Sequence, residues 1–136
     1  MIRLSLWRAP VVLAYMAGIV WLSSLPGSTL GRLGLEAWLA NLAHLPLFAG
    51  LGALSLWALE GRLWLRAASA LAVGFLFGLS DEWHQTFVPG RVFSVGDLAF
   101  DALGLALGVW SAHWVQRSRS MSDALSKTPG VREPAR

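Results

Sequence analysis

Four apolar stretches, each close to the length that a helix needs to cross a membrane, limit the folds that this chain can adopt. They run over residues 9–25, 37–59, 63–80 and 98–115. A spanning helix needs roughly 20 mostly apolar residues, with a range of about 17–25. Only 14% of the residues are charged, against about 25% in an ordinary soluble domain. The pattern predicts an all-α polytopic membrane protein, a bundle of four transmembrane helices.

The positions of the Trp residues support these spans independently. All 8 lie near an end of a predicted helix: Trp7, Trp21, Trp38, Trp57, Trp64, Trp83, Trp110 and Trp114. Indole rings prefer the headgroup level of a bilayer, because the ring face is apolar while the N–H favours water. The core of a soluble protein gives Trp residues no reason to avoid the helix centres.

The 11 Lys and Arg residues divide unequally between the two sides of the predicted membrane. Arg32 and Arg91 lie on one side, and the other side holds the rest: Arg3, Arg8, Arg62, Arg66, Arg117, Arg119, Lys127, Arg132 and Arg136. The positive-inside rule therefore predicts a multi-pass protein of the cell (inner, cytoplasmic) membrane with both termini in the cytoplasm. Because topology explains the net charge of +3, we predict no nucleic-acid partner.

The length of 136 residues suits a single domain. We expect a four-helix transmembrane domain over residues 1–116 and a mobile cytoplasmic tail over 117–136, which is rich in Ser, Pro and Arg. The first apolar stretch lacks a clean small-x-small cleavage site, so we expect it to be retained. The absence of Cys excludes disulfides, thiol catalysis and zinc–cysteine sites.

Polar residues inside the spans are candidates for function, since a charged group costs roughly 2.5–3.5 kcal/mol at the centre of a membrane helix. At 100° per residue, one face of the fourth span carries Ser94, Asp97, Asp101, Gly104, Gly108 and Ser111. The Gly-xxx-Gly pair on this face allows another helix backbone to approach closely. Asp97 is placed to cap the helix. Asp101 lies a full turn further in, where an ion pair to Arg91 is one alternative to a functional role.

Two further spans show similar faces. The third carries Gly74, Gly78, Asp81 and Gln85 if its helix continues beyond residue 80, and the second carries Asn41, His44, Phe48, Gly52 and Ser55. Glu82 lies about 100° from Asp81, so these two carboxylates need not meet. The polar ends of the three faces all lie toward the outer side. We therefore expect them to converge in one outward-facing site.

The loop after the third span contains Pro89 and Gly90, which suit the second and third positions of a type II turn. Apolar residues flank this turn: Phe87, Val88, Val92 and Phe93. We expect a re-entrant-like outer loop that dips back against the bundle with Arg91 at its tip. Such a loop is tolerated at membrane depth where it packs on protein or lines a wet cavity.

The run from Ser80 to Arg91, followed by Ser94, Asp97 and the Gly104/Gly108 helix, resembles the signature of VanZ-like membrane proteins. That signature is Asp-Glu-x-x-Gln, then Pro-Gly-Arg, a Ser and an Asp, and a small-residue helix. The run Ser23-Ser24-x-Pro26 resembles the Ser-x-Pro end of the family's first helix, and His44 with Phe48 resembles its second-helix motif. The resemblance covers about residues 10–115. The family often has Asp-Lys shortly before the His, where this chain has Ala40 and Asn41.

The resemblance implies a link to low-level resistance to the glycopeptide teicoplanin, but it implies no reaction. We therefore predict a cell-envelope membrane protein whose outward site binds or modifies a lipid-linked or peptidoglycan-related ligand. Two other classes stay open. One is a non-catalytic membrane subunit or a small proton- or ion-coupled carrier that uses the acidic cluster. The other is a packing protein that assembles into oligomers through its Gly-xxx-Gly faces.

The predicted site has two groups of residues. Candidate acid/base or positioning residues are Asp81, Glu82, Asp97 and His44; candidate ligand-binding residues are Arg91, Gln85, His84, Ser94, Asp101, Asn41 and Ser24. Arg91 would bind an anionic headgroup or a carboxylate. A metal held by His44, Asp81, Glu82 and Asp97 is conceivable, but no tight local spacing supports it, so neither metal nor cofactor is predicted. The expected partners are membrane lipid and an envelope-lipid or peptidoglycan-precursor ligand.

Overall fold

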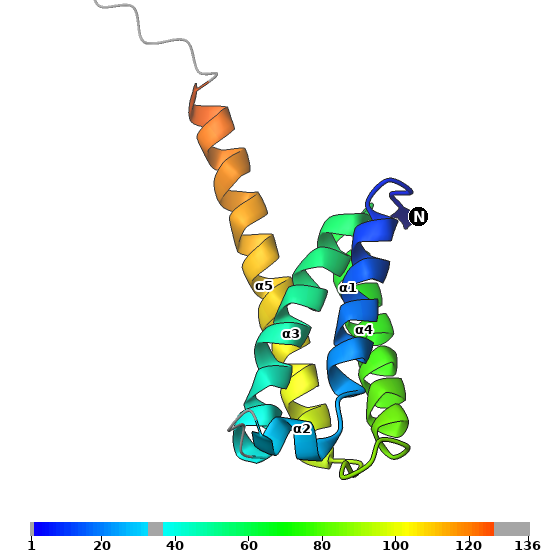
Figure 1. Cartoon of the computed structure of the whole chain (residues 1–136). Helices are drawn as coiled ribbons and strands as arrows, with labels where there is room; N and C mark the ends of the chain where they lie inside the picture. Colours follow the sequence, from blue (N-terminus) through cyan, green and yellow to red (C-terminus); the bar gives the residue numbers. More distant parts are fainter. Residues whose placement is uncertain (1, 33–36, 127–136) are drawn as a thin grey trace, which may run out of the picture.

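The structure is a computed structural model that describes residues 2–32 and 37–126, apart from the side chains at 30–31, 37–41 and 125–126. The described residues form five helices and one small antiparallel ladder (Figure 1). These elements are β1 (Arg3–Leu4), α1 (Ala9–Ser23), α2 (Gly27–Arg32), α3 (Ala37–Ala58), β2 (Leu59–Glu60), α4 (Leu63–Gln85) and α5 (Val95–Ser126). The predicted all-α class is confirmed, and the two-residue strands are an addition to it.

The helices alternate in direction along the bundle, so the molecule has two distinct ends (Figure 1). The β1–β2 end holds the ladder and the starts of α1 and α4. The α2 end holds α2, the start of α3 and the connection from α4 to α5. The helix α5 runs from the α2 end past the opposite end of the bundle (Figure 1). Where they are described, the segments that the charge pattern assigned to one side of a membrane therefore lie at one end of the fold.

The most extensive contact between two helices is that of α3 with α5, and glycines make this close approach possible. A Cβ added to Gly52 would lie 2.5 Å from the carbonyl oxygen of Leu105. A Cβ added to Gly104 or Gly108 would overlap the carbonyl oxygen of Leu45 or Ala49 on α3. The predicted role of the Gly-xxx-Gly face is thus confirmed, because a larger residue at these positions would push the two backbones apart.

Apolar residues fill the middle of the bundle between its two ends. One buried cluster contains Ile19, Phe48, Leu51 and Leu105, and a second contains Leu56, Ala70 and Val109. Many other apolar side chains point outward, such as Val73 and Leu76 on α4, which are 60% and 64% exposed. A helix that is apolar on its outer face as well as its inner face is typical of a protein surrounded by lipid.

Two described helices are long and apolar enough to cross a membrane: Leu63–Gln85, and α5 over Val95–Ala124. Two shorter apolar helices accompany them, at Ala9–Ser23 and Leu42–Ala58. The first and second predicted spans therefore stay predictions, although each of them forms a helix at the predicted place. The third and fourth spans meet the criterion of length and composition.

One additional helix and two helix ends differ from those expected. The loop between the first two spans contains α2. The helix α4 continues to Gln85, so the polar face predicted for the third span does lie on a helix. The helix α5 continues to Ser126, so residues 117–126 of the predicted mobile tail are helical. No Gly or Pro interrupts the chain between Gly108 and Pro129. Once the helix has started, nothing in this segment stops it.

The turn after α4 has the predicted form but not the predicted packing. Gly90 has a φ of +77°, and the Arg91 N–H donates to the Val88 carbonyl over 3.0 Å, as in a type II turn. Of the apolar flanks only Val88 is buried, while Phe87 and Val92 are 74% and 77% exposed. The turn is fixed to α2 instead, through a 3.1 Å hydrogen bond from the Gly27 N–H to the Pro89 carbonyl. The re-entrant packing of this loop against the bundle is therefore not confirmed.

Candidate functional site

Polar side chains from all four long helices gather at the α2 end, and we call this group the polar cluster. It consists of Ser23 on α1, His44 on α3, Asp81, Glu82 and Gln85 on α4, Arg91 and Ser94 in the connection, and Asp97 and Asp101 on α5. All of these residues are buried except Arg91 and Ser94, which are half-buried. The predicted convergence of the three polar faces is confirmed.

The side chain of Gln85 joins the α4 part of the polar cluster. Its Nε2 donates to Asp81 Oδ2 over 3.1 Å and to Glu82 Oε1 over 3.2 Å, and its Oε1 accepts a hydrogen bond from the Arg91 guanidinium. Spacings of three and four residues bring these side chains together on one face of a helix. The two carboxylates, which helical angles alone left apart, are thus linked through a single amide.

Ser94 is the N-cap of α5. Its Oγ accepts a 3.1 Å hydrogen bond from the N–H of Asp97, the third residue of α5. Its own N–H donates to Glu82 Oε2 over 2.8 Å, so a carboxylate on α4 also fixes the start of α5. The expectation that Asp97 caps this helix was wrong. Because Ser94 supplies the cap, the Asp97 carboxylate is left for other interactions.

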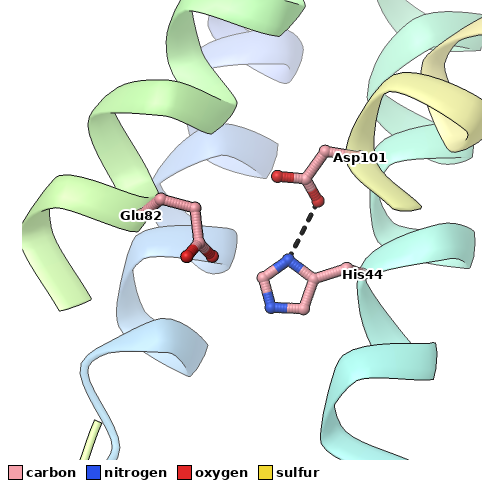
Figure 2. Close-up of side chains that lie close together, drawn as sticks. All are labelled: His44, Glu82 and Asp101. Atoms are coloured by element: carbon pink, nitrogen blue, oxygen red, sulfur yellow. Dashed lines mark hydrogen bonds and ion pairs between the residues drawn. The ribbon is translucent and has the colours of Figure 1, made fainter. Parts of the chain in front are cut away.

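His44 connects α3 to α5. Its Nδ1 lies 2.9 Å from Asp101 Oδ1, in a buried hydrogen bond, and its Nε2 lies 4.0 Å from Asp97 Oδ2 (Figure 2 shows the pair with Asp101). Asp97 and Asp101 occupy successive turns of α5 and therefore flank the same imidazole. In the described part of the chain, no carboxylate lies within ion-pair distance of Arg91. The considered ion pair from Asp101 to Arg91 is thus replaced by the pair with His44.

The first helix contributes Ser23, which sequence reasoning passed over in favour of its neighbour. Ser23 is buried, and its Oγ donates to Asp81 Oδ1 over 2.6 Å. Ser24 is exposed and shares a 2.9 Å hydrogen bond with His84 Nε2, outside the buried cluster. Helical spacing could have found Ser23, because it follows the buried Ile19 by four residues and so shares its face. Asn41 belongs to α3, but its side chain lies outside the described residues.

Two carboxylate oxygens in the polar cluster are buried with no hydrogen-bond partner, Oδ1 of Asp97 and Oδ2 of Asp101. The cluster contains four carboxyl groups against one guanidinium and one imidazole. Burying this many acidic groups in a low dielectric is costly unless cations or protons compensate them. His44, Glu82 and Asp101 can each offer one ligand atom within 4.8 Å of the others. Chemically, the cluster can bind a cation and present Arg91 to an anion.

Comparison with known proteins agrees with the signature residues. The chain matches the family VanZ/LLP1 over residues 7–116, a range that includes the entire polar cluster. No curated protein and no solved structure matches the chain. The family match and the two helices of membrane-crossing length make this a membrane protein. With the match extending over most of its length, the chain belongs to the VanZ/LLP1 family.

Proposed function

We propose that this chain is a multi-pass protein of the cell membrane whose polar cluster faces outward and binds an anionic, lipid-linked or peptidoglycan-related ligand. This binding would underlie a role in resistance to glycopeptides such as teicoplanin, with which the family is associated. The observation that carries the proposal is the environment of Arg91. Its half-buried guanidinium is held by the Gln85 amide and not by a carboxylate of the described residues.

The chemistry of Arg91 fits an anionic ligand. A guanidinium has five N–H donors in a planar fork, which matches a phosphate or carboxylate in a bidentate manner. The hydrogen bond to Gln85 uses one nitrogen and leaves the others for a ligand. Gln85 is itself held by Asp81 and Glu82, so those carboxylates act as positioning residues for Arg91. Binding is therefore the function that this geometry supports best, ahead of acid–base catalysis.

The charge distribution supports an outward-facing cluster. The β1–β2 end carries Arg3 in the ladder and Arg8 and Arg62 at the starts of α1 and α4, whereas the α2 end has Arg32 and Arg91. With α1, α3, α4 and α5 as four spans, the positive-inside rule places the α2 end outside the cell. The helix α5 has 32 residues, about 48 Å at 1.5 Å per residue. This exceeds a hydrocarbon core of about 30 Å, so its end would project into the cytoplasm.

A proton- or ion-coupled carrier receives less support. A carrier needs polar groups along its path through the membrane. Toward the middle of the bundle, the polar cluster gives way to the buried apolar residues Phe48, Leu51 and Leu105. A second apolar cluster around Leu56 follows before the β1–β2 end.

The ligand-binding role is tested by producing the full chain in a teicoplanin-susceptible bacterium and measuring the minimal inhibitory concentration. Arg91→Gln removes the charge while keeping a polar side chain, and we expect it to abolish the protection that the unmodified chain gives. Arg32→Gln is the matched control, because Arg32 is exposed at the same end of the bundle. Equal protection by both variants, at equal membrane levels on an immunoblot, would overturn the role of Arg91.

Orientation is tested separately with single cysteines, since the chain contains none of its own. Ser28→Cys on α2 and Ser118→Cys near the end of α5 both replace exposed side chains. A membrane-impermeant maleimide added to intact cells should label the first variant and spare the second. The reverse pattern would place the polar cluster in the cytoplasm and contradict an outward site.

A further inference from the structure

Three side chains in the polar cluster form a set with the composition of a metal site. His44, Glu82 and Asp101 come from α3, α4 and α5, and each is buried. Each offers one ligand atom, and these atoms lie within 4.8 Å of one another. Figure 2 shows the imidazole and the two carboxylates turned toward a common space between the three helices.

An independent observation concerns the oxygens that lack partners. Asp101 is 0% exposed, and its Oδ2 has no hydrogen-bond partner, while its Oδ1 is bonded to His44. In Figure 2 one Asp101 oxygen points to His44 and the other toward the side of Glu82. Asp97 Oδ1 is also buried without a partner. Native proteins leave few buried polar atoms unsatisfied, so Asp101 Oδ2 calls for a donor or a cation.

The charges around His44 favour a cation over a water molecule. Glu82, Asp97 and Asp101 all lie near this imidazole, and Arg91 is bonded to Gln85. A divalent cation would neutralise two of these carboxylates at once, and it is often the largest local charge in such a site. An imidazole beside carboxylates suits Zn²⁺ or Mn²⁺, whereas Ca²⁺ and Mg²⁺ are bound by sets of oxygens.

We propose that His44, Glu82 and Asp101 bind a divalent transition-metal cation. Bonds of about 2.0–2.2 Å from Zn²⁺ to nitrogen and oxygen ligands place neighbouring ligand atoms roughly 3–4 Å apart. His44 Nδ1 and Asp101 Oδ1 are 2.9 Å apart in a hydrogen bond, so a cation bound to both atoms would replace the proton that they share. The Glu82 ligand atom lies within 4.8 Å of the other two, so metal binding requires a shift of roughly 1 Å to reach the ligand spacing of such a site. Asp97, 4.0 Å from the imidazole, is the nearest further carboxylate.

The inference concerns the same end of the bundle as the proposed function but does not depend on the envelope ligand. Metal content is measured on purified protein, whereas the role of Arg91 is measured as protection of cells. A protein that binds metal but gives no protection would leave this site intact and remove the proposed function. A protein that protects cells but binds no metal would remove this site and leave the proposed function intact.

The test uses the full chain in detergent micelles, stripped with EDTA, incubated with Zn²⁺ or Mn²⁺, desalted and analysed by mass spectrometry of the metal. We expect about one ion per chain. Loss of an outer hydrogen-bond partner of a metal ligand typically weakens binding by 10–100-fold, so loss of a ligand should cost at least about 100-fold. His44→Gln, Glu82→Gln and Asp101→Asn should therefore retain less than about a tenth of the metal.

Matched controls come from the opposite end of the bundle. His113→Gln and Glu60→Gln remove the same residue types from α5 and β2 and should leave the metal content unchanged. Metal loss in these controls equal to that in the site variants would overturn the proposal, as would the absence of metal from the unmodified chain.

A second measurement keeps the proposal testable if the site variants fail to fold. The chain has 3 His residues, so selective ¹⁵N-histidine labelling gives a small, assignable spectrum. Adding Zn²⁺ to the unmodified protein should shift the ring nitrogens of His44. A shift confined to His84 or His113 would show that the metal binds elsewhere.

Discussion

At the β1–β2 end of the bundle, arginines lie against backbone carbonyls and indole rings, whereas at the α2 end carboxylates are buried close to one another. Arg8 donates to the Trp57 carbonyl and Arg66 donates to the Leu56 carbonyl, each over 2.7 Å. These carbonyls belong to the last turn of α3, where carbonyl groups have no hydrogen-bond donor within the helix. The Arg8 guanidinium also lies 4.7 Å and 4.9 Å from the rings of Trp7 and Trp57.

The two ends differ in how their buried charges are matched. The arginines of the β1–β2 end bind carbonyls that the helix leaves free, whereas the carboxylates of the α2 end outnumber their cationic partners. Basic side chains at a helix C-terminus satisfy free carbonyls and interact favourably with the helix dipole. Each of these arginines leaves its Nε–H without a partner, while one of its terminal nitrogens donates to a carbonyl at the end of α3. The polar cluster instead has more carboxylates than its guanidinium and imidazole can balance. This excess identifies the α2 end as the candidate site.

The largest loss of stability should come from removing one partner of the pair formed by His44 and Asp101. His44→Leu leaves a buried carboxylate uncompensated, which typically costs about 3–5 kcal/mol. The double variant His44→Leu with Asp101→Leu should recover most of this free energy of unfolding, because apolar replacement of a complete buried pair is often neutral. Reversible unfolding of the micellar protein by SDS measures both variants. A single variant as stable as the double variant would contradict a buried ion pair.

A smaller effect is expected at the opposite end. Arg8→Leu removes a hydrogen bond from a charged group, worth about 1.5–3 kcal/mol, and cation–π contacts worth about 0.5–1 kcal/mol at exposed sites. We expect the free energy of unfolding to fall by about 2–3 kcal/mol, with metal content and protection against teicoplanin preserved. The same unfolding assay, run beside the two functional assays, checks this. Loss of function at full membrane level would show that the β1–β2 end does more than stabilise the fold.

The smallest effect distinguishes two neighbouring serines. Ser23→Ala deprives the buried Asp81 carboxylate of a donor, at a cost of about 1–2 kcal/mol. Ser24→Ala alters an exposed hydrogen bond to His84, and such surface changes usually stay within about 0.5 kcal/mol. Thermal unfolding of the two variants side by side gives the comparison. Equal or reversed costs would mean that the polar cluster does not extend to α1 through Ser23.

Much of the site could be predicted from helical spacing and from the resemblance to the family. Asp81 with Gln85 and Asp97 with Asp101 lie on one face of a helix because they are four residues apart. Spacing could not show that Gln85 bridges Asp81 and Glu82, since that depends on side-chain rotation. It also assigned the cap of α5 to Asp97, whereas Ser94 performs it, because a helix start is decided by which oxygen reaches the free N–H groups.

The helical class, the number and order of the long helices, and the end of the bundle at which the acidic residues gather can all be read from the sequence alone. These follow from local periodicity and from the energetic cost of exposing polar groups to lipid, both of which can be read along one chain. The hydrogen-bond partners emerge only from the folded chain: His44 with Asp101, Arg91 with Gln85, and Ser23 with Asp81. Pairing depends on how far each helix is rotated and shifted against its neighbours. In this bundle the close packing of α3 on the glycines of α5 sets that register.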